Sequence, residues 1–251
     1  MMTAIGRFLF FGLLLAVWVL IGLLIIAGYF SWCAVEKKQP VIRWWSQKLL
    51  RLCRVQLKVS GAPQASGAVL WVANHVSWLD IFVINSVRST HFVAKSDIKG
   101  WPVLGWLVAG AGTVFIERER RSAIKQVATQ LQQLFAQGLV VGLFPEGTTT
   151  DGLAVKPFHN SLFGAAIAAG APVQTIALRF YAGNARSTRF AFTGEQSLIA
   201  NLWFLLGSKE PARIECEFMH SLSAEECSAL GRAELGRWAW DSIAQGVAKD
   251  L

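Results

Sequence analysis

A histidine and an aspartate in one short polar segment are the first candidates for chemistry in this chain. Asn74, His75 and Asp80 directly follow an apolar run that ends at residue 73. A histidine five residues before an aspartate can turn back across a corner between a loop and a helix, so that the carboxylate accepts the Nδ1 hydrogen and leaves Nε2 as a base. No Gly-x-Ser-x-Gly elbow occurs in the chain, so this base would act on a hydroxyl group of the substrate. Taken alone, the spacing also fits a structural pair.

A second segment brings an arginine to the end of a predicted strand. Residues 112–118 read GTVFIER, so that Gly112 precedes the strand and Arg118 follows it. Arginine can bind a phosphate through two parallel hydrogen bonds. The alternative is a solvated cluster with the two arginines at positions 120 and 121.

A third segment is a turn that is rich in glycine and hydroxyl side chains. Residues 144–152 read FPEGTTTDG. Glu146 can accept hydrogen bonds from the hydroxyl groups of a glycerol, and the N–H groups around Gly147 and Thr148 can bind an anion. The alternative is a plain turn without a ligand.

Composition excludes several classes of protein. The 251 residues are 53% hydrophobic and 16% charged, with a mean hydropathy of +0.42, which excludes a disordered chain, a collagen-like repeat and an ordinary very soluble domain. The four cysteines lie far apart without a Cys-x-x-Cys pair, and no spacing typical of metal ligands occurs. We therefore expect no metal site, no disulfide framework and a reducing compartment.

Apolar runs and helical periodicity alternate along the body of the chain. The predicted strands cover residues 68–73, 113–116, 139–144 and 173–180; the predicted helices cover residues 122–137 and 161–169, and a last helix opens with the capping box of Ser223 and Glu226. This alternation predicts an α/β domain with a mainly parallel sheet flanked by helices. In such sheets, chemistry takes place where the strands end.

The N-terminus carries an apolar run that can anchor the chain in a membrane. Phe8 to Val35 are 28 residues without a charge, which as a helix measure about 42 Å against a hydrocarbon core of about 30 Å. We interpret this run as a retained anchor, because no clear small-x-small cleavage site follows it. A cleaved signal peptide is one alternative, and a helix that dips into the bilayer and returns is another.

Positive charge gathers beside this run. Residues 1–60 hold eight basic side chains and one acid, whereas the remaining 191 residues hold 16 basic and 15 acidic side chains. Residues 40–54 place apolar side chains at helical spacing between arginines and lysines, which is typical of a helix at lipid headgroups and argues against a nucleic-acid site directly after an anchor. The basic bias predicts that residues after about 36 are cytoplasmic.

The three polar segments, in this order, resemble the glycerophospholipid acyltransferase family. Residues 74–80 are similar to its N-H-x4-D box, residues 112–118 to its G-x-x-F-I-x-R box, residues 144–148 to its F-P-E-G-T box, and residues 171–178 to its fourth, proline-bearing box. The resemblance covers residues 60–200 and is nearest to the 1-acylglycerol-3-phosphate acyltransferases. It implies an N-terminal anchor in residues 1–36, a basic interfacial helix in residues 37–58 and an acyltransferase domain in residues 59–251.

The resemblance implies a reaction and a role for each residue. A fatty acyl group moves from acyl-CoA or acyl carrier protein to the free hydroxyl of a lysophospholipid, with His75 as the base and Asp80 as its support. Arg118 would bind the phosphate of the acceptor. The other expected substrate-binding residues are Asn74, Gly112, Glu146, Gly147 and Thr148. Neither a bound cofactor nor a metal is expected. The expected partners are membrane lipids and the two substrates, with no nucleic acid, and the expected location is the cytoplasmic face of a bacterial inner membrane.

Two departures from the family pattern bear on the acceptor. The family commonly has arginine after F-P-E-G-T, where this chain has Thr149, and often a second proline in the fourth box, where this chain has Thr175. Loss of the arginine removes one phosphate contact and favours other lysolipids, such as lyso-ornithine lipid. A lipid-binding protein without catalysis and a hydrolase are the remaining alternatives.

Overall fold

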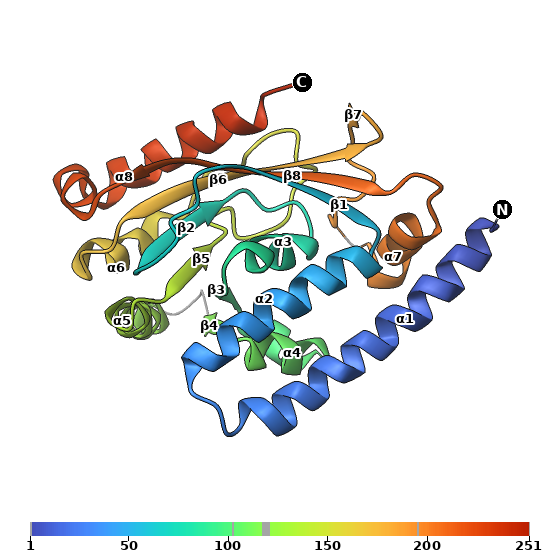
Figure 1. Ribbon diagram of the computed structural model, residues 1–251. Coiled ribbons are helices and arrows are strands. Elements are labelled where there is room, and N and C mark those ends of the chain that lie inside the picture. Colours follow the sequence, from blue (N-terminus) through green and yellow to red (C-terminus); the bar gives the residue numbers. More distant parts are fainter. Residues whose placement is uncertain (1, 102, 117–120, 195, 251) are drawn as a thin grey trace.

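The computed structural model describes residues 2–101, 103–116, 121–194 and 196–250. Within these residues, eight strands form one sheet in the order β1-β8-β6-β2-β5-β3-β4, with β7 paired to β6 (Figure 1). The strands are β1 Val55–Gly61, β2 Val69–Ala73, β3 Thr90–Lys95, β4 Val114–Ile116, β5 Val140–Leu143, β6 Val173–Ala182, β7 Ala185–Arg186 and β8 Ala212–Leu222.

The centre of the sheet is parallel. Strands β6, β2, β5, β3 and β4 pair in parallel, β1 pairs in parallel with β8, and β8 runs antiparallel to β6. Every residue of β2 and β5 is buried, as is typical of strands with helices on both sides. The predicted mainly parallel sheet flanked by helices is confirmed.

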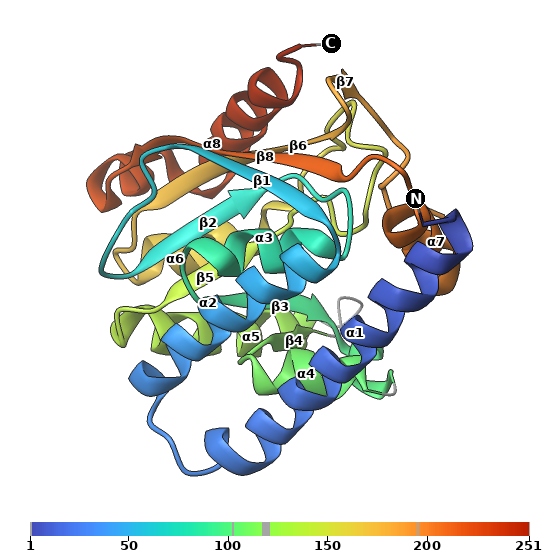
Figure 2. The same ribbon diagram turned by 45° about the vertical axis from the view of Figure 1, so that its right-hand side comes forward.

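Helices cover both faces of this sheet. They are α1 Ala4–Leu24, α2 Val35–Leu52, α3 Leu79–Val87, α4 Leu104–Gly110, α5 Arg121–Ala136, α6 Phe163–Ala168, α7 Leu198–Gly207 and α8 Ala224–Val247; a π-helical turn, Ile25–Phe30, extends α1. We call the side of α5, α6 and α8 the back face and the side of α1, α2, α3, α4 and α7 the front face (Figure 2). Each face has its own apolar core, and α8 begins with the predicted capping box.

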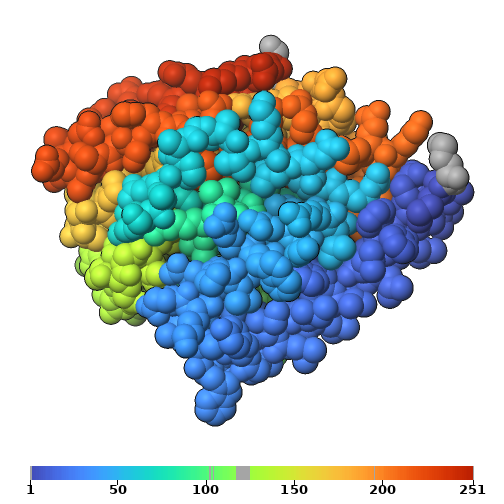
Figure 3. Space-filling model, viewed as in Figure 1, coloured from blue at the N-terminus to red at the C-terminus, as the bar shows by residue number. Residues whose placement is uncertain are grey.

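The predicted apolar N-terminal helix forms and lies along the front face. Residues Ala4–Phe30 are long and apolar enough to cross a membrane, with a mean hydropathy of 3.0. In the space-filling view, the helix is a dark blue ridge at the lower right (Figure 3). Its outward side exposes Ile5, Leu9, Phe10, Leu13, Leu14, Val17, Leu20 and Leu24.

The inward side of α1 packs on the domain from end to end. Near its start, Arg7 donates to the carbonyl of Gly207 in α7. Further along, the Trp18 indole donates to the carbonyl of Trp45 in α2 at 3.2 Å. Gly22 faces the ring of the same Trp45, where a Cβ would lie only 2.9 Å from the indole.

Helix α2 is amphipathic as predicted, but its apolar side does not face lipid. Ile42, Trp45 and Leu49 are buried, because this side packs against α3 and α1. The helix ends at Leu52, and residues 55–58, which the sequence analysis placed in the interfacial helix, begin strand β1. Helical periodicity indicates an apolar side but not what covers it, so the expected lipid contact of this side is corrected.

Candidate active site

The His75–Asp80 pair lies at the carboxyl end of β2, where the chain turns into α3. Asp80 Oδ2 is 2.8 Å from His75 Nδ1, so the predicted hydrogen bond is confirmed. Because a carboxylate only accepts, Nδ1 carries the hydrogen and Nε2 is the nitrogen that can take up a proton. The arrangement has the geometry that a general base requires, at the edge of the sheet.

The carboxylate of Asp80 is held from several directions. Its Oδ2 also accepts the backbone N–H groups of Val76 at 2.7 Å and Ser77 at 2.9 Å, and the side chain is fully buried. Asp80 is in the first turn of α3, where the helix dipole favours a negative charge. These contacts fix the carboxylate, and thereby the orientation of the imidazole.

The imidazole of His75 is supported by a stack of aromatic rings. It lies on Phe144 with a centroid distance of 4.1 Å and an angle of 11°, and Phe144 lies on Phe92 at 5.3 Å. The His75 side chain keeps 19% of its surface exposed, so a substrate can reach it. The two phenylalanines were not among the predicted site residues, because their stacking joins three separate strands.

Glu146 binds the backbone of the base instead of presenting a free carboxylate. Its Oε1 accepts the N–H of His75 at 2.7 Å, and its Oε2 accepts the N–H of Lys156 at 2.9 Å. The side chain is buried, and burial raises the pKa of this carboxyl group, against the lowering effect of the two N–H donors. Glu146 therefore joins the third segment to the first, and its expected contact with substrate stays a prediction.

Asn74 is also a positioning residue in this structure. Its amide nitrogen donates to the carbonyl of Leu178 at 3.0 Å, and its amide oxygen accepts the N–H of Leu178 at 2.8 Å. The side chain is fully buried, so the expected substrate contact is not formed by these atoms. The pair of bonds joins the end of β2 to β6.

Gly147 and Thr148 lie in the turn after β5, near the base. Gly147 has a φ of +73°, which favours glycine, and Thr148 is exposed. Thr150 secures this turn by donating from its backbone and its hydroxyl to the carbonyl of His75, at 2.8 and 3.2 Å. The hydroxyl of Thr149 donates to the carbonyl of Phe192.

The second segment is placed differently from the expectation. Arg118 lies outside the described residues. Gly112 precedes β4 and lies at the amino edge of the sheet, away from His75. Its φ is +82°, and a Cβ there would lie 2.4 Å from Nδ1 of His91, which donates to the carbonyl of Gly112 at 2.9 Å. The close approach that requires this glycine is therefore made by His91.

Asn201 in α7 is a further residue that the sequence analysis missed. Its amide oxygen accepts the Trp78 indole hydrogen at 2.9 Å, and its amide nitrogen donates to the carbonyl of Ala191 at 3.0 Å. The backbone N–H of Phe192, which follows Ala191, donates to the carbonyl of Val76 at 2.9 Å. A lone asparagine in an apolar helix is the only local signal of this role.

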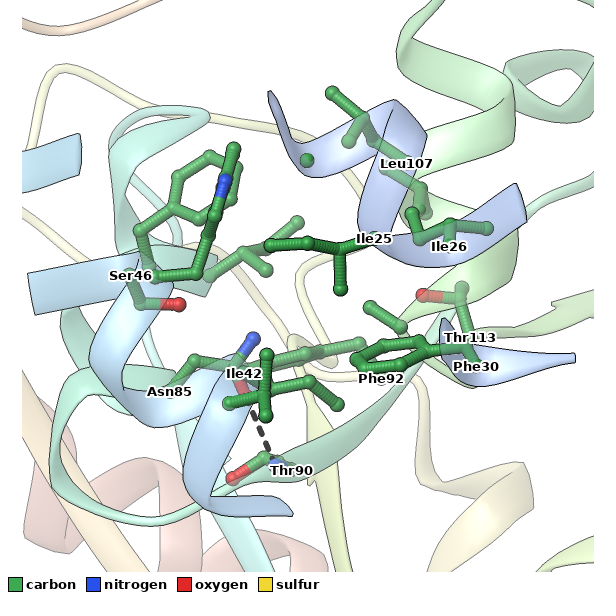
Figure 4. Close-up of a pocket in the computed structure, with 17 residues that line it drawn as sticks. Ile25, Ile26, Phe30, Ile42, Ser46, Asn85, Thr90, Phe92, Leu107 and Thr113 are labelled. Carbon is green, nitrogen blue, oxygen red and sulfur yellow. Dashed lines mark hydrogen bonds between the residues drawn. The ribbon is translucent and has the colours of Figure 1, made fainter. Parts of the chain in front are cut away.

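An apolar cavity lies on the front face beside the aromatic stack. Ile25, Ile26, Ile42, Phe92 and Leu107 are among the side chains that line it (Figure 4). These residues come from the π-helical turn that follows α1, from α2, from β3 and from α4. Because Phe92 is also part of the stack, two rings separate the cavity from His75.

The chain is similar in sequence to known acyltransferases. The family model described as Acyltransferase matches residues 54–179. The chain is 33% identical to a lyso-ornithine lipid O-acyltransferase of Pseudomonas aeruginosa, over 82% of this chain and 78% of that protein. It is 39% identical to a 1-acyl-sn-glycerol-3-phosphate acyltransferase of Neisseria gonorrhoeae, over 66% and 64%.

A solved structure shows the same fold. It is the 1-acyl-sn-glycerophosphate (LPA) acyltransferase of Thermotoga maritima, with a TM-score of 0.66 at 20% identity over 94% of both chains. The matched family model spans all the boxes quoted from the sequence, including the His75–Asp80 pair. The chain therefore belongs to the acyltransferase family.

Proposed function

We propose that this protein transfers a fatty acyl group from a thioester to the free hydroxyl of a lysolipid, with lysophosphatidic acid as the first candidate acceptor. The observation that carries the proposal is an imidazole at the sheet edge whose Nδ1 is held by a buried carboxylate. Acyl-CoA and acyl carrier protein are the candidate donors, and the step needs no bound cofactor. Phosphatidic acid for phospholipid synthesis is then the product.

The base acts on the acceptor. His75 Nε2 removes the hydroxyl proton while the oxygen attacks the thioester carbonyl, and the C–S bond breaks when the tetrahedral intermediate collapses. The imidazolium then returns the proton to the leaving thiolate, so that the products are an ester and a thiol. Asp80 stabilises the imidazolium between these two steps, and such base catalysis typically contributes about 10²–10⁴-fold in rate.

Lyso-ornithine lipid is the second candidate acceptor. Thr149 stands where the family commonly has arginine, and its hydroxyl is bound to the carbonyl of Phe192. The turn therefore lacks one cation that could bind a phosphate. Exposed Thr148 remains beside the base for an acceptor of either kind.

The long apolar helix supports attachment to a membrane. Since α1 contacts the domain from Arg7 to Gly22, a crossing of the bilayer apart from the domain would break these contacts. We propose that α1 lies along the surface of one leaflet with its exposed side in the lipid, on the cytoplasmic face of a bacterial inner membrane. The lysines and arginines of α2 favour anionic headgroups there.

The apolar cavity fits the hydrocarbon part of a substrate. Its apolar walls favour a hydrocarbon chain, and Phe92 connects them to the aromatic stack that supports His75. The cavity lies between the membrane helices and the domain, so a chain can enter it from the lipid side.

A lysolipid panel tests the proposal. The detergent-solubilised protein is incubated with a labelled acyl thioester, on CoA or on acyl carrier protein, and with lysophosphatidic acid, lyso-ornithine lipid and other lysolipids. Label in a diacyl lipid supports the transferase and identifies the acceptor. Label in free fatty acid with every acceptor indicates a hydrolase, and no turnover at all indicates a lipid-binding protein; either result would overturn the proposal.

A further inference from the structure

Helix α7 has an apolar outer side that nothing in the described structure covers. Ile199 is 72% exposed, and Trp203 and Phe204 are each 39% exposed. The helix carries no charge along its ten residues. Exposed aromatic and aliphatic side chains grouped on one side of a helix mark a contact with a partner or with lipid.

This outer side continues the exposed side of α1. The rings of Phe8 and Trp203 meet edge to face at a centroid distance of 5.2 Å. Arg7 donates from Nε and Nη2 to the carbonyl of Gly207, at 3.1 and 2.7 Å, which places a cation at the C-terminus of α7. The two helices lie side by side in both ribbon views (Figures 1 and 2).

Basic side chains border this joint apolar surface. Arg54 donates to the carbonyls of Leu206 and Lys209, so that Arg7, Arg54 and exposed Lys209 gather where α7 ends; one exposed acid, Glu210, follows. An apolar surface with a basic border matches the boundary between lipid tails and anionic headgroups.

The inner side of α7 fixes the orientation of the helix. Leu205 and Leu206 are buried in the front core, and Asn201 is tied to Trp78 and Ala191. A rotation that hid Ile199 would break these contacts. The outer side therefore stays exposed for as long as the active-site loops keep their arrangement.

We infer that α7 is a second lipid-contacting helix, which enters the same leaflet as the neighbouring α1 and holds the His75 loop at the membrane. The inference rests on the proposed attachment of α1. It adds a contact between Trp203 and the lipid, 195 residues after Phe8 in the chain, at the helix whose Asn201 binds the His-x4-Asp segment.

A polarity-sensitive thiol probe tests the inference. In a Cys33→Ser background, where the other three cysteines are fully buried, single cysteines replace Ile199 on α7, Leu13 on α1 and Leu230 on α8. Each labelled protein is transferred from detergent into vesicles of phosphatidylethanolamine and phosphatidylglycerol. Emission at position 199 should shift to the blue and become protected from iodide, as at position 13, whereas position 230 should stay accessible.

Other outcomes separate the alternatives. A shift at position 13 without one at position 199 overturns the inference and leaves the attachment of α1 intact. No shift at either position overturns both. A shift at position 199 that grows with protein concentration in detergent, without vesicles, assigns this side to a second copy of the chain and overturns the lipid contact.

A matched pair of charge variants adds a functional readout. Ile199→Asp should lower acyl transfer to vesicle-embedded lysolipid about tenfold, equivalent to about 1.4 kcal/mol, and leave transfer to micellar lysolipid unchanged. Leu230→Asp, which puts the same charge on the exposed side of α8, should change neither rate. Equal rates for the two variants on vesicles contradict the inference, and thermal unfolding of both confirms that they are folded.

Discussion

The two faces of the sheet meet their surroundings in different ways. On the back face, α8 buries Leu235, Ala239 and Ile243 in the core, and Leu230 is its one large apolar side chain that is highly exposed within the described residues. On the front face, α1 buries only Leu15 and Gly22 and exposes leucines along its length. The difference agrees with the proposal that the front face contacts lipid while the back face meets water, and the rings that support His75 belong to the front core.

The largest expected effect is a loss of catalysis that leaves the packing of both faces unchanged. His75→Ala should lower acyl transfer by about 10²–10⁴-fold, because the acceptor hydroxyl loses its base. The variant should remain folded and bound to membranes. His220→Ala, which removes an exposed histidine that meets Trp238 on the back face, should keep full activity. An active His75→Ala protein would show that the base lies elsewhere.

A pair of leucine truncations compares the faces directly. Leu131→Ala on α5 should lower the free energy of unfolding by about 2–5 kcal/mol, because Leu131 is fully buried in the back core. Leu13→Ala on α1 should change it by less than about 0.5 kcal/mol in detergent and weaken vesicle binding instead. Denaturant unfolding and vesicle flotation measure the two quantities. Similar unfolding effects for both variants would mean that α1 is a core helix.

The link between α7 and the active site gives a smaller expected effect. Asn201→Leu leaves the Trp78 indole hydrogen and the Ala191 carbonyl without their partner, which should lower the free energy of unfolding by about 1–3 kcal/mol. The acyl transfer rate should fall too, because the loop beside His75 loses its support. Leu202→Met, at the half-buried next position, is the control and should change neither quantity. Full activity of the Asn201 variant would show that this residue stabilises the fold without supporting the loop beside His75.

The smallest expected effect is a pH dependence on the front face. Burial lowers the pKa of His91 from its usual 6.5. As the pH falls, the unfolded chain therefore binds a proton at this side chain before the folded chain does. Stability should therefore be lost as the pH falls below about 6.5. His91→Gln keeps a donor for the Gly112 carbonyl and should show a smaller fall in Tm between about pH 7 and pH 5.5. Parallel curves for the two proteins would exclude His91 as the cause.

The predicted strands and site residues show what local sequence can tell. The starts of β2, β5 and β6 agree with the prediction within one residue, because strands buried on both sides are continuous apolar runs ended by turns. Strand β8 was missed, since Glu215 and Glu217 interrupt its apolar pattern. Both acids bind Arg179, which lies 36 and 38 positions earlier in the chain. That partner cannot be seen in a local window.

The candidate site shows the same limit: a contact within one loop could be predicted, and a contact between distant segments could not. His75 and Asp80 are five residues apart, so their hydrogen bond could be predicted from one loop. Glu146 was assigned to the substrate because its partner, the N–H of His75, lies 71 positions away and belongs to the backbone. The bonds of Asn74 could not be predicted for the same reason, since both go to the backbone of Leu178; its contact with substrate stays a prediction.

The bonds from Glu146 and Thr150 to the backbone of His75 have a consequence for how such enzymes diversify. They secure the turn after β5 by its ends, so the exposed side chain at position 148 is not needed to hold it, and the hydroxyl of Thr149 binds Phe192 instead of the His75 loop. We expect mutations at these two positions to alter which headgroup is accepted without moving His75. A lineage can thus change its lipid substrate through a few exchanges in one turn, which agrees with relatives that are named for two different lysolipids.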